Sequence, residues 1–340
     1  MITSNKCPNC SGELVYDVDS KELKCTHCSS IQKFEKVSEK VEKKLLTSDS
    51  TIEKSKTEYT QYSCQTCGRK HISATDTPLL RCPSCGDNNL VKTVKIDFTP
   101  DGIVPFKINK NTALENFYIW LKTQHFAPNS LKKLGKSKIL DGFYLPAYFY
   151  DFDCSTHFSG VGVNIFRSPN GQMHTTRHHF DKTREDKYVN RIESASSSIS
   201  SVKMRQLGNY CENNILLYRT EFLYGWFGSQ VDSSLQDNSL NMKRIVTQEI
   251  ALNVRAKLPY ASIENFNCST NFSDIMYKYI YLPVYKGFYR YKKRDFSYYI
   301  NGENGNVAGK TPKSFWKIFF LVLGIAAVAG AIAYLYYISR

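Results

Sequence analysis

Hydrophobic positions divide the chain into three kinds of sequence. Residues 1–95 are polar, residues 96–310 are rich in tyrosine and phenylalanine, and Ile318–Ile338 is a run of 21 residues without a charge. At about 1.5 Å per helical residue, such a run spans a hydrocarbon core of about 30 Å. The pattern predicts one transmembrane helix over residues 314–338.

The flanks of this helix predict its orientation. Aromatic side chains stand at both ends, as is usual at the two membrane interfaces. Lys310, Lys313 and Lys317 precede the span and only Arg340 follows it, which predicts that the N-terminal bulk is cytoplasmic. The start MITSNKCPNC does not resemble a signal peptide. We therefore expect a single-pass, tail-anchored protein of the cell membrane. Small residues four apart, such as Ala326 and Gly330, allow a homo-oligomer through this helix.

Residues 96–310 alternate between helix and strand signals. Thr112 and Glu115 form a capping box, and the apolar spacing that follows predicts a helix ending before Pro128. A second helix is expected at 239–257. Strands are expected at 145–158, around 160–180 and 215–228, and in a meander after residue 278 that turns at 292–295 and 301–305. Two similar pieces, YLPAYFY from Tyr144 and YLPVY from Tyr281, allow a duplicated hairpin.

Eight of the 11 cysteines fall in four CxxC pairs. The spacing CxxC-x14-CxxC occurs twice, offset by 57 residues, which indicates two copies of one module. Two CxxC knuckles at the ends of a hairpin supply four thiolates for tetrahedral Zn²⁺. The predicted ligands of two structural zinc ions are Cys7, Cys10, Cys25 and Cys28, and Cys64, Cys67, Cys82 and Cys85.

Other interpretations of the cysteines are weaker. A disulfide framework is disfavoured in the cytosol, and a redox CxxC would stand beside a βαβ unit. His27 and His71 are expected to lie in the solvent or beside the metal, because four cysteines already complete each site. Cys154, Cys211 and Cys268 are interpreted as ordinary thiols.

These patterns predict an α+β fold with two small four-cysteine zinc ribbons, a mostly antiparallel β-rich domain with a few helices, and one C-terminal transmembrane helix. Residues 35–60 are predicted to be a solvated linker in which Val37, Val41 and Leu45 allow a short amphipathic helix. The expected segments are ribbon 1 (1–34), charged linker (35–60), ribbon 2 (61–95), α+β domain (96–310) and anchor (314–338).

Charge is concentrated near the anchor. The formal net charge is +14, and it falls to about +10 once eight thiolates bind two zinc ions. The excess lies in the membrane-proximal domain, where two clusters are prominent: Lys132, Lys133, Lys136 and Lys138, and Lys286, Arg290, Lys292, Lys293 and Arg294. Basic residues interleaved with tyrosines suit a nucleic acid, but beside an anchor we favour an anionic inner leaflet.

Signals for catalysis are weak. His174, His178 and His179, with Asp181 close behind, form the one histidine cluster, in a polar segment that suggests an exposed strand and loop. Serine-hydrolase, zinc-protease and paired-carboxylate signatures are absent from the sequence. We therefore expect a protein that is not an enzyme.

Several motifs together resemble a family of uncharacterised bacterial membrane proteins described as transcription factor IIB-type zinc-ribbon-containing, sometimes labelled phage helicase-related. They are YSCQTCG…CPSCG at 62–86, PDGIVPFKI at 100–108, LPAYFYDFD at 145–153 and YLPVY…RDFSYYINGENGNVAG at 281–309. The helicase label does not fit, because GNVAGKT at 305–311 is one residue too short for a Walker A loop.

The resemblance implies a role in scaffold or envelope-stress complexes. Together with the residues, it favours a non-enzymatic membrane adaptor whose zinc ribbons bind an unknown protein partner. The first alternative is a membrane-tethered nucleic-acid-binding protein, and the second is an unrecognised enzyme built on residues 96–310.

Overall fold

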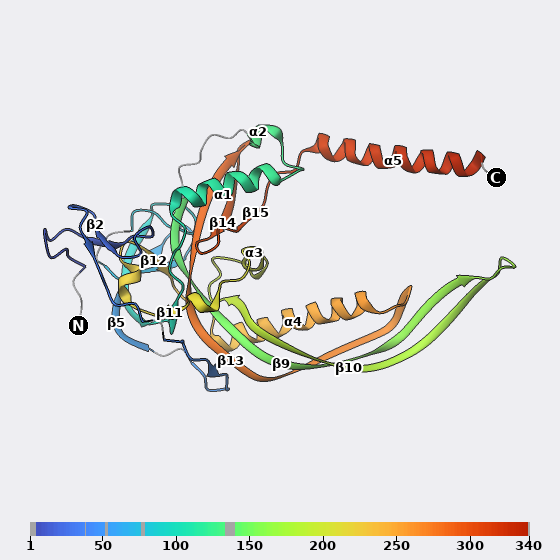
Figure 1. The fold of residues 1–340 in the computed structure, drawn as a ribbon, viewed down its shortest axis with the longest axis horizontal. Helices are drawn as coiled ribbons and strands as arrows, with labels where there is room; N and C mark the ends of the chain where they lie inside the picture. The colour runs from blue at the N-terminus through green and yellow to red at the C-terminus, as the bar shows by residue number, and fades with distance from the viewer. Residues whose placement is uncertain (1–4, 38, 52–53, 76–78, 133–139, 339–340) are drawn as a thin grey trace.

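The fold is α+β with mostly antiparallel sheets, as predicted, in a computed structural model that describes residues 5–37, 39–51, 54–75, 79–132 and 140–338. A β-rich body carries the N-terminal ribbon at one end (Figure 1). Three very long strands leave the body as an arm lined by helix α4, and helix α5 leaves it at a separate point. Lys133, Lys136, Lys138 and Arg340 lie outside the described residues.

Helices are few and mostly peripheral. In the described residues they are α1 (Lys110–Thr123), α2 (Asn129–Lys132), α3 (Ser201–Gln206), α4 (Leu235–Lys257) and α5 (Phe315–Ile338), with 3-10 turns at Glu212–Asn214 and Thr220–Leu223.

Strands form a small sheet and a large one. The small antiparallel sheet contains β1 (Leu14–Tyr16), β2 (Leu23–Cys25) and β3 (Ile31–Gln32). The large sheet contains β4 (Lys44–Leu45), β5 (Lys54–Cys64), β6 (Lys70–Ser73), β7 (Leu90–Phe98), β8 (Gly102–Ile103), β9 (Leu140–Arg167), β10 (Met173–Ser194), β11 (Leu216–Leu217), β12 (Phe227–Ser229), β13 (Ser262–Tyr291), β14 (Arg294–Asn301) and β15 (Val307–Gly309).

The centre of the large sheet is the antiparallel pair β9–β13. The two YLP pieces lie opposite each other, with Tyr144 facing Pro283, Leu145 facing Leu282 and Pro146 facing Tyr281. Successive side chains of a strand point to opposite faces. One face of the pair therefore buries tyrosines such as Tyr144 and Tyr281, and the other buries aliphatic residues such as Leu145 and Leu282. Most of the tyrosines on these two strands are therefore core residues.

Both long helices predicted within residues 96–310 are present. Helix α1 starts earlier than expected, because Asn109 is its N-cap and accepts a 3.0 Å hydrogen bond from the amide of Thr112. Thr112 was predicted to be the cap and instead lies in the first turn. An Asn side chain caps a helix as well as a Thr does, and Asn109 comes first along the chain. The predicted turns between β13, β14 and β15 are also present.

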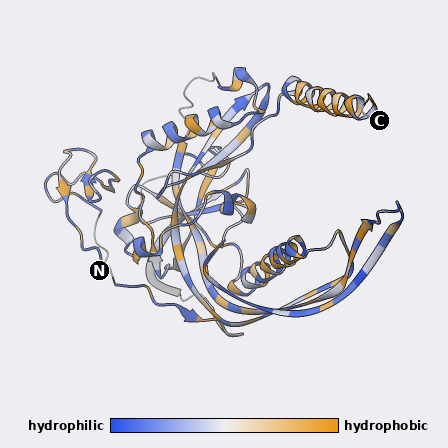
Figure 2. Cartoon of the chain, turned by 45° about the vertical axis from the view of Figure 1, so that its right-hand side comes forward, coloured by the Kyte–Doolittle hydropathy of each residue, from blue (hydrophilic) through white to orange (hydrophobic). Residues whose placement is uncertain are grey.

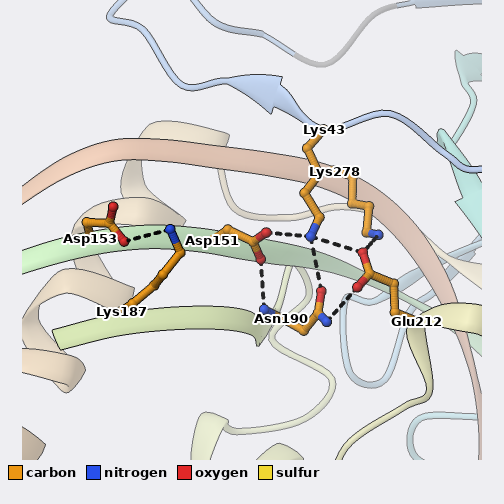
Figure 3. A network of polar contacts seen from close by, with 7 residues as sticks. All are labelled: Lys43, Asp151, Asp153, Lys187, Asn190, Glu212 and Lys278. Atoms are coloured by element: carbon orange, nitrogen blue, oxygen red, sulfur yellow. Dashed lines mark hydrogen bonds and ion pairs between the residues drawn. The ribbon is translucent and has the colours of Figure 1, made fainter.

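The described part of 35–60 contains no amphipathic helix and is not wholly solvated. Residues 39–51 lie against the sheet as a strap, in which Val41 is buried and Lys44–Leu45 pairs with β13 as strand β4, and residues 54–60 belong to β5. A network of polar contacts holds the strap against the long strands of the sheet (Figure 3). Lys43 pairs with Asp151 and, at 3.0 Å, with Glu212, and Glu212 also pairs with the buried Lys278 at 2.6 Å. Contact with β13 thus outweighs the local helix spacing.

Helix α5 is long and apolar enough to cross a membrane, with a mean hydropathy of 2.5. Apolar residues surround it on all sides (Figure 2), and its side chains are not covered by the rest of the chain. A core helix of a soluble protein would be mostly buried, so exposure on every side suits a lipid environment.

Candidate metal centres

The first candidate centre lies between the two knuckles of the small sheet. The Sγ atoms of Cys7, Cys10, Cys25 and Cys28 lie within 4.8 Å of one another. Two of the Sγ–Sγ distances are 3.7 Å (Cys7–Cys28) and 3.5 Å (Cys10–Cys25). Tetrahedral zinc with Zn–S bonds of about 2.3 Å requires sulfur atoms about 3.8 Å apart. The four thiols could therefore hold one metal ion.

The second candidate centre joins the β5–β6 hairpin to the loop before β7. Cys64, Cys67, Cys82 and Cys85 form the same kind of group, with Sγ–Sγ distances of 3.5 Å (Cys64–Cys85) and 3.8 Å (Cys67–Cys82). The structure thus brings together the eight cysteines that the spacing selected, in the two predicted sets.

All four knuckles close with the same backbone turn. The residue after the second cysteine has a positive φ and donates its amide to the carbonyl of the first cysteine. The four residues are Ser11 (φ 57), Ser29 (φ 60), Gly68 (φ 70) and Gly86 (φ 83), with N–O distances of 2.8 to 3.1 Å. Glycine reaches this region without strain, so the CxxCG pattern of ribbon 2 signals the turn more clearly than CxxCS in ribbon 1.

The first ribbon packs against the body through a few contacts. Trp226 donates its indole N–H to the carbonyl of Tyr16 at 2.9 Å, and the amide of Tyr16 donates to the carbonyl of Tyr224 at 2.8 Å. The four-cysteine group of ribbon 1 is nevertheless accessible to solvent, because Cys10 and Cys28 are exposed. A hydroxyl bond from Ser30 is the main cause that lowers the pKa of Cys7 to about 6.

The second ribbon is part of the large sheet. Strand β6 pairs with β12, which pairs in turn with β9, so the ribbon and the body share one hydrogen-bonded sheet. Cys82 is fully buried, and burial raises its pKa. The predicted boundary between 61–95 and 96–310 therefore does not separate two independent sheets.

Two buried residues accompany the second group. His71 has no exposed surface, and its Nε2 lies 3.4 Å from Cys82 Sγ. Burial, followed by the charges of Arg69 and Lys286, lowers the pKa of His71 to about 3, so the ring is neutral and can donate from Nε2. Lys286 on β13 donates to the Ser84 carbonyl at 2.5 Å. His71 lies beside the candidate metal, whereas His27 is exposed in its knuckle.

Lys286 was grouped from the sequence with surface charges, and the structure corrects this. It is 5% exposed and lies over the rings of Phe288 and Tyr299. Tyr285 and Tyr289 are buried as well. Both faces of β13 are covered at this point, so Lys286 is buried on one face and Tyr285 and Tyr289 on the other. The exposed bases begin at Arg290, so the proposed interleaving of bases and tyrosines is not a surface.

The histidine cluster does not converge on one point. His174 and His178 stack on Phe166 and Tyr260 on one face of β10, whereas His179 lies on the other face. Asp181 instead contacts His157 on the neighbouring strand β9, with 2.6 Å between Asp181 Oδ1 and His157 Nε2. Both side chains are exposed. These residues lie on the surface of the arm.

A cleft of about 530 Å³ lies between the two ribbons. Its lining includes Val15–Asp19 of ribbon 1, Leu79–Arg81 of ribbon 2, Leu140–Gly142 at the start of β9, and the segment Gly225–Phe227. Leu80 at this cleft is 78% exposed, which makes it one of the most exposed apolar side chains outside α5. No sequence pattern predicts this cleft, because the segments that line it are far apart in the chain.

Comparison with known proteins finds one distant similarity. The chain is 23% identical over 330 residues to "Uncharacterized protein YdjG" of Bacillus subtilis (strain 168), covering 96% of this chain and 95% of that protein. No protein-family model matches the chain. No solved structure matches it.

Proposed function

We propose that this protein is a non-enzymatic adaptor, anchored through α5 with its bulk in the cytoplasm, that presents zinc-loaded ribbons to a protein partner. It fits the transcription factor IIB-type zinc-ribbon family that its motifs resemble, and envelope stress is the process we favour. Eight cysteines in two tetrahedral-sized groups and one fully exposed apolar helix support a membrane-anchored metal-binding protein.

Zinc is the ion that we propose for both groups. Four thiolates without a free position for water suit a structural ion, which stabilises a fold and leaves no site for catalysis. When bound, the ion would fix the knuckles of each ribbon. In this proposal Cys7, Cys10, Cys25 and Cys28 hold one ion, and Cys64, Cys67, Cys82 and Cys85 hold the other.

The cleft between the ribbons carries the partner proposal. Its location depends on both centres, because Val15–Asp19 belongs to one ribbon and Leu79–Arg81 to the other. An exposed leucine at the edge of a concave, partly apolar surface is typical of a site that buries a partner's side chain. Ribbon 1, which supplies one wall of the cleft, lies at the end of the molecule away from α5 (Figure 1).

Site-specific photo-crosslinking tests the partner. A photoreactive residue at Leu80 of the anchored protein should give a discrete adduct in native membranes. The control is Leu252 on α4, which is also exposed, at 69% compared with 78% for Leu80. The Leu80 adduct should disappear in the C10S/C28S variant, which cannot complete the first centre. The same adducts from both positions, or none from Leu80, would refute a partner at the cleft.

A further inference from the structure

The first turn of α5 is fixed to the body, and this determines which surface meets the membrane. The Ser314 amide donates to the Phe126 carbonyl at 2.7 Å, and Lys317 Nζ donates to the carbonyls of Ala127 at 2.8 Å and His125 at 3.1 Å. Since the apolar helix starts at Phe315, residues bonded to this turn lie at headgroup depth whatever the tilt of the helix. The junction between α1 and α2 therefore lies at the membrane interface.

A basic turn lies beside this junction. The Tyr291 hydroxyl is 2.7 Å from the Ser130 hydroxyl of α2, and the Tyr289 hydroxyl donates to the carbonyl of Lys310 at 3.0 Å. These contacts hold the β13–β14 turn next to α2 and the start of α5, as Figure 1 shows. Residues 290–294 of this turn include four basic residues, all exposed.

Local acids neutralise little of this charge. Arg290 and Asp295 approach to 3.7 Å, but their side chains are 72% and 74% exposed, so the pair is weak. Exposed apolar side chains accompany this charge: Ile119, which lies one helical turn before Lys122 on α1, is 62% exposed, and Phe126 in the junction after α1 is 43% exposed. Exposed bases beside exposed apolar residues are typical of a surface that binds headgroups and the outer acyl region.

We propose that this surface binds the headgroups of anionic phospholipids in the leaflet that α5 enters. It is called the collar here and consists of Lys122, Phe126, Arg290, Lys292, Lys293 and Arg294. The proposal rests on the membrane anchoring proposed above and adds a lipid class. Each base near an anionic surface favours apposition about fivefold. The collar holds the body against the leaflet, which directs the ribbons and their cleft away from it.

Amine-reactive labelling of the full chain in nanodiscs, with the labelled lysines read by mass spectrometry, tests the collar. One disc contains phosphatidylcholine alone, and the other contains one-third phosphatidylglycerol. Lys122, Lys292 and Lys293 should label several-fold more slowly in the anionic disc, and high salt should remove this protection. Lys24 and Lys33, exposed on the distant ribbon, should label equally in both.

A charge-reversed variant completes the test. K292E/K293E should abolish the protection of Lys122, and K24E/K33E should preserve it. Equal labelling of the collar lysines in the two discs would overturn the proposal. A second result would also overturn the proposal: an added oligonucleotide protects the collar lysines in phosphatidylcholine discs, whereas phosphatidylglycerol does not protect them. That result would indicate a nucleic-acid surface. Failure of α5 to integrate, seen as extraction of the chain from both membranes by alkali, would refute the anchoring itself.

Discussion

Lys286 and Ser84 join the central strand of the sheet to the second metal centre. The ammonium of Lys286, buried on β13, donates a 2.5 Å hydrogen bond to the Ser84 carbonyl inside the Cys82–Cys85 knuckle. Four thiolates with one divalent ion carry a net charge of about −2, which favours a buried cation nearby. A metal–thiolate group formed there would thus be balanced by a lysine from a distant part of the sequence.

Replacing Lys286 with methionine should therefore weaken metal retention at the second centre. Loss of a residue that orients or neutralises the ligands typically costs about 10- to 100-fold in metal affinity. Zinc release to a chelator, followed with a colorimetric indicator, measures this. K203M is the control, because Lys203 lies 4.8 Å from the centre of the same Tyr299 ring. Equal release from the two variants would contradict the compensation.

The two centres should lose metal in a fixed order. Cys10 and Cys28 are exposed, whereas their counterparts Cys67 and Cys85 are half-buried in a ribbon that belongs to the large sheet. A chelator should take the ion of the first centre faster, and local unfolding of ribbon 1 should leave the sheet intact. A chelator that takes both ions at one rate would contradict this order.

Trp226 reports which centre has opened. Its indole bonds to the Tyr16 carbonyl of ribbon 1, so its fluorescence should change with release of the first ion and not the second. Trp120 and Trp316 are replaced by phenylalanine to isolate the signal. A fluorescence change that accompanied only release of the second ion would show that Trp226 does not report the opening of the first centre.

The local parts of this structure could be predicted from sequence, and the long-range parts could not. CxxC spacing locates the ligands because a knuckle is a turn of four residues. From the sequence, His71 is only a histidine near a knuckle and Lys286 belongs to a basic surface cluster, because the residues that contact them come from distant segments of the chain. The sheet that ribbon 2 shares with the body is also not predictable from sequence, because its strands β6, β12 and β9 come from distant segments.

Similar limits explain the strap and the YLP pieces. The i, i+4 spacing of Val37, Val41 and Leu45 fits a helix, but pairing with β13 holds the segment extended. Likeness between the two YLP pieces was visible in the sequence, whereas the pairing of Leu145 with Leu282 was not. A strand pattern predicts that a segment pairs but does not identify its partner.

Adding one methyl group at Gly12 should loosen the first centre selectively. A Cβ there would lie 2.9 Å from His27 Cβ, 3.1 Å from Cys25 Sγ and 3.3 Å from Cys10 Sγ. Overpacking of this kind costs about 1–3 kcal/mol. G12A should therefore release the first zinc ion faster and leave the second unchanged. N9A is the matched control, since Asn9 is exposed in the same knuckle. Unchanged release from G12A would mean that the knuckle relaxes around the methyl group.

The strap should loosen in acid through Glu212. Partial burial acts to raise the pKa of this carboxyl, but hydrogen bonds from Lys278, Asn190 and Lys43 outweigh it and lower the pKa from 4.5 to about 2. A lowered folded-state pKa gives stability that is present above the ordinary pKa and lost as pH falls toward the folded value. The Leu46 amide donates to the Ile275 carbonyl at 2.8 Å and should lose protection from hydrogen exchange over that range.

The E212Q variant separates this effect from other acid effects. Glutamine keeps the shape of the side chain but cannot ionise. In this variant the Leu46 amide should already be less protected from hydrogen exchange at neutral pH, and its protection should lack the pH dependence that the carboxyl causes. Both proteins lose cysteine-bound metal in acid, because thiolates become protonated. The difference between their Leu46 exchange rates, each corrected for intrinsic exchange, therefore isolates the carboxyl. That difference should shrink as pH falls from 4.5 toward 2, and a constant difference would show that Glu212 does not clasp the strap through its charge.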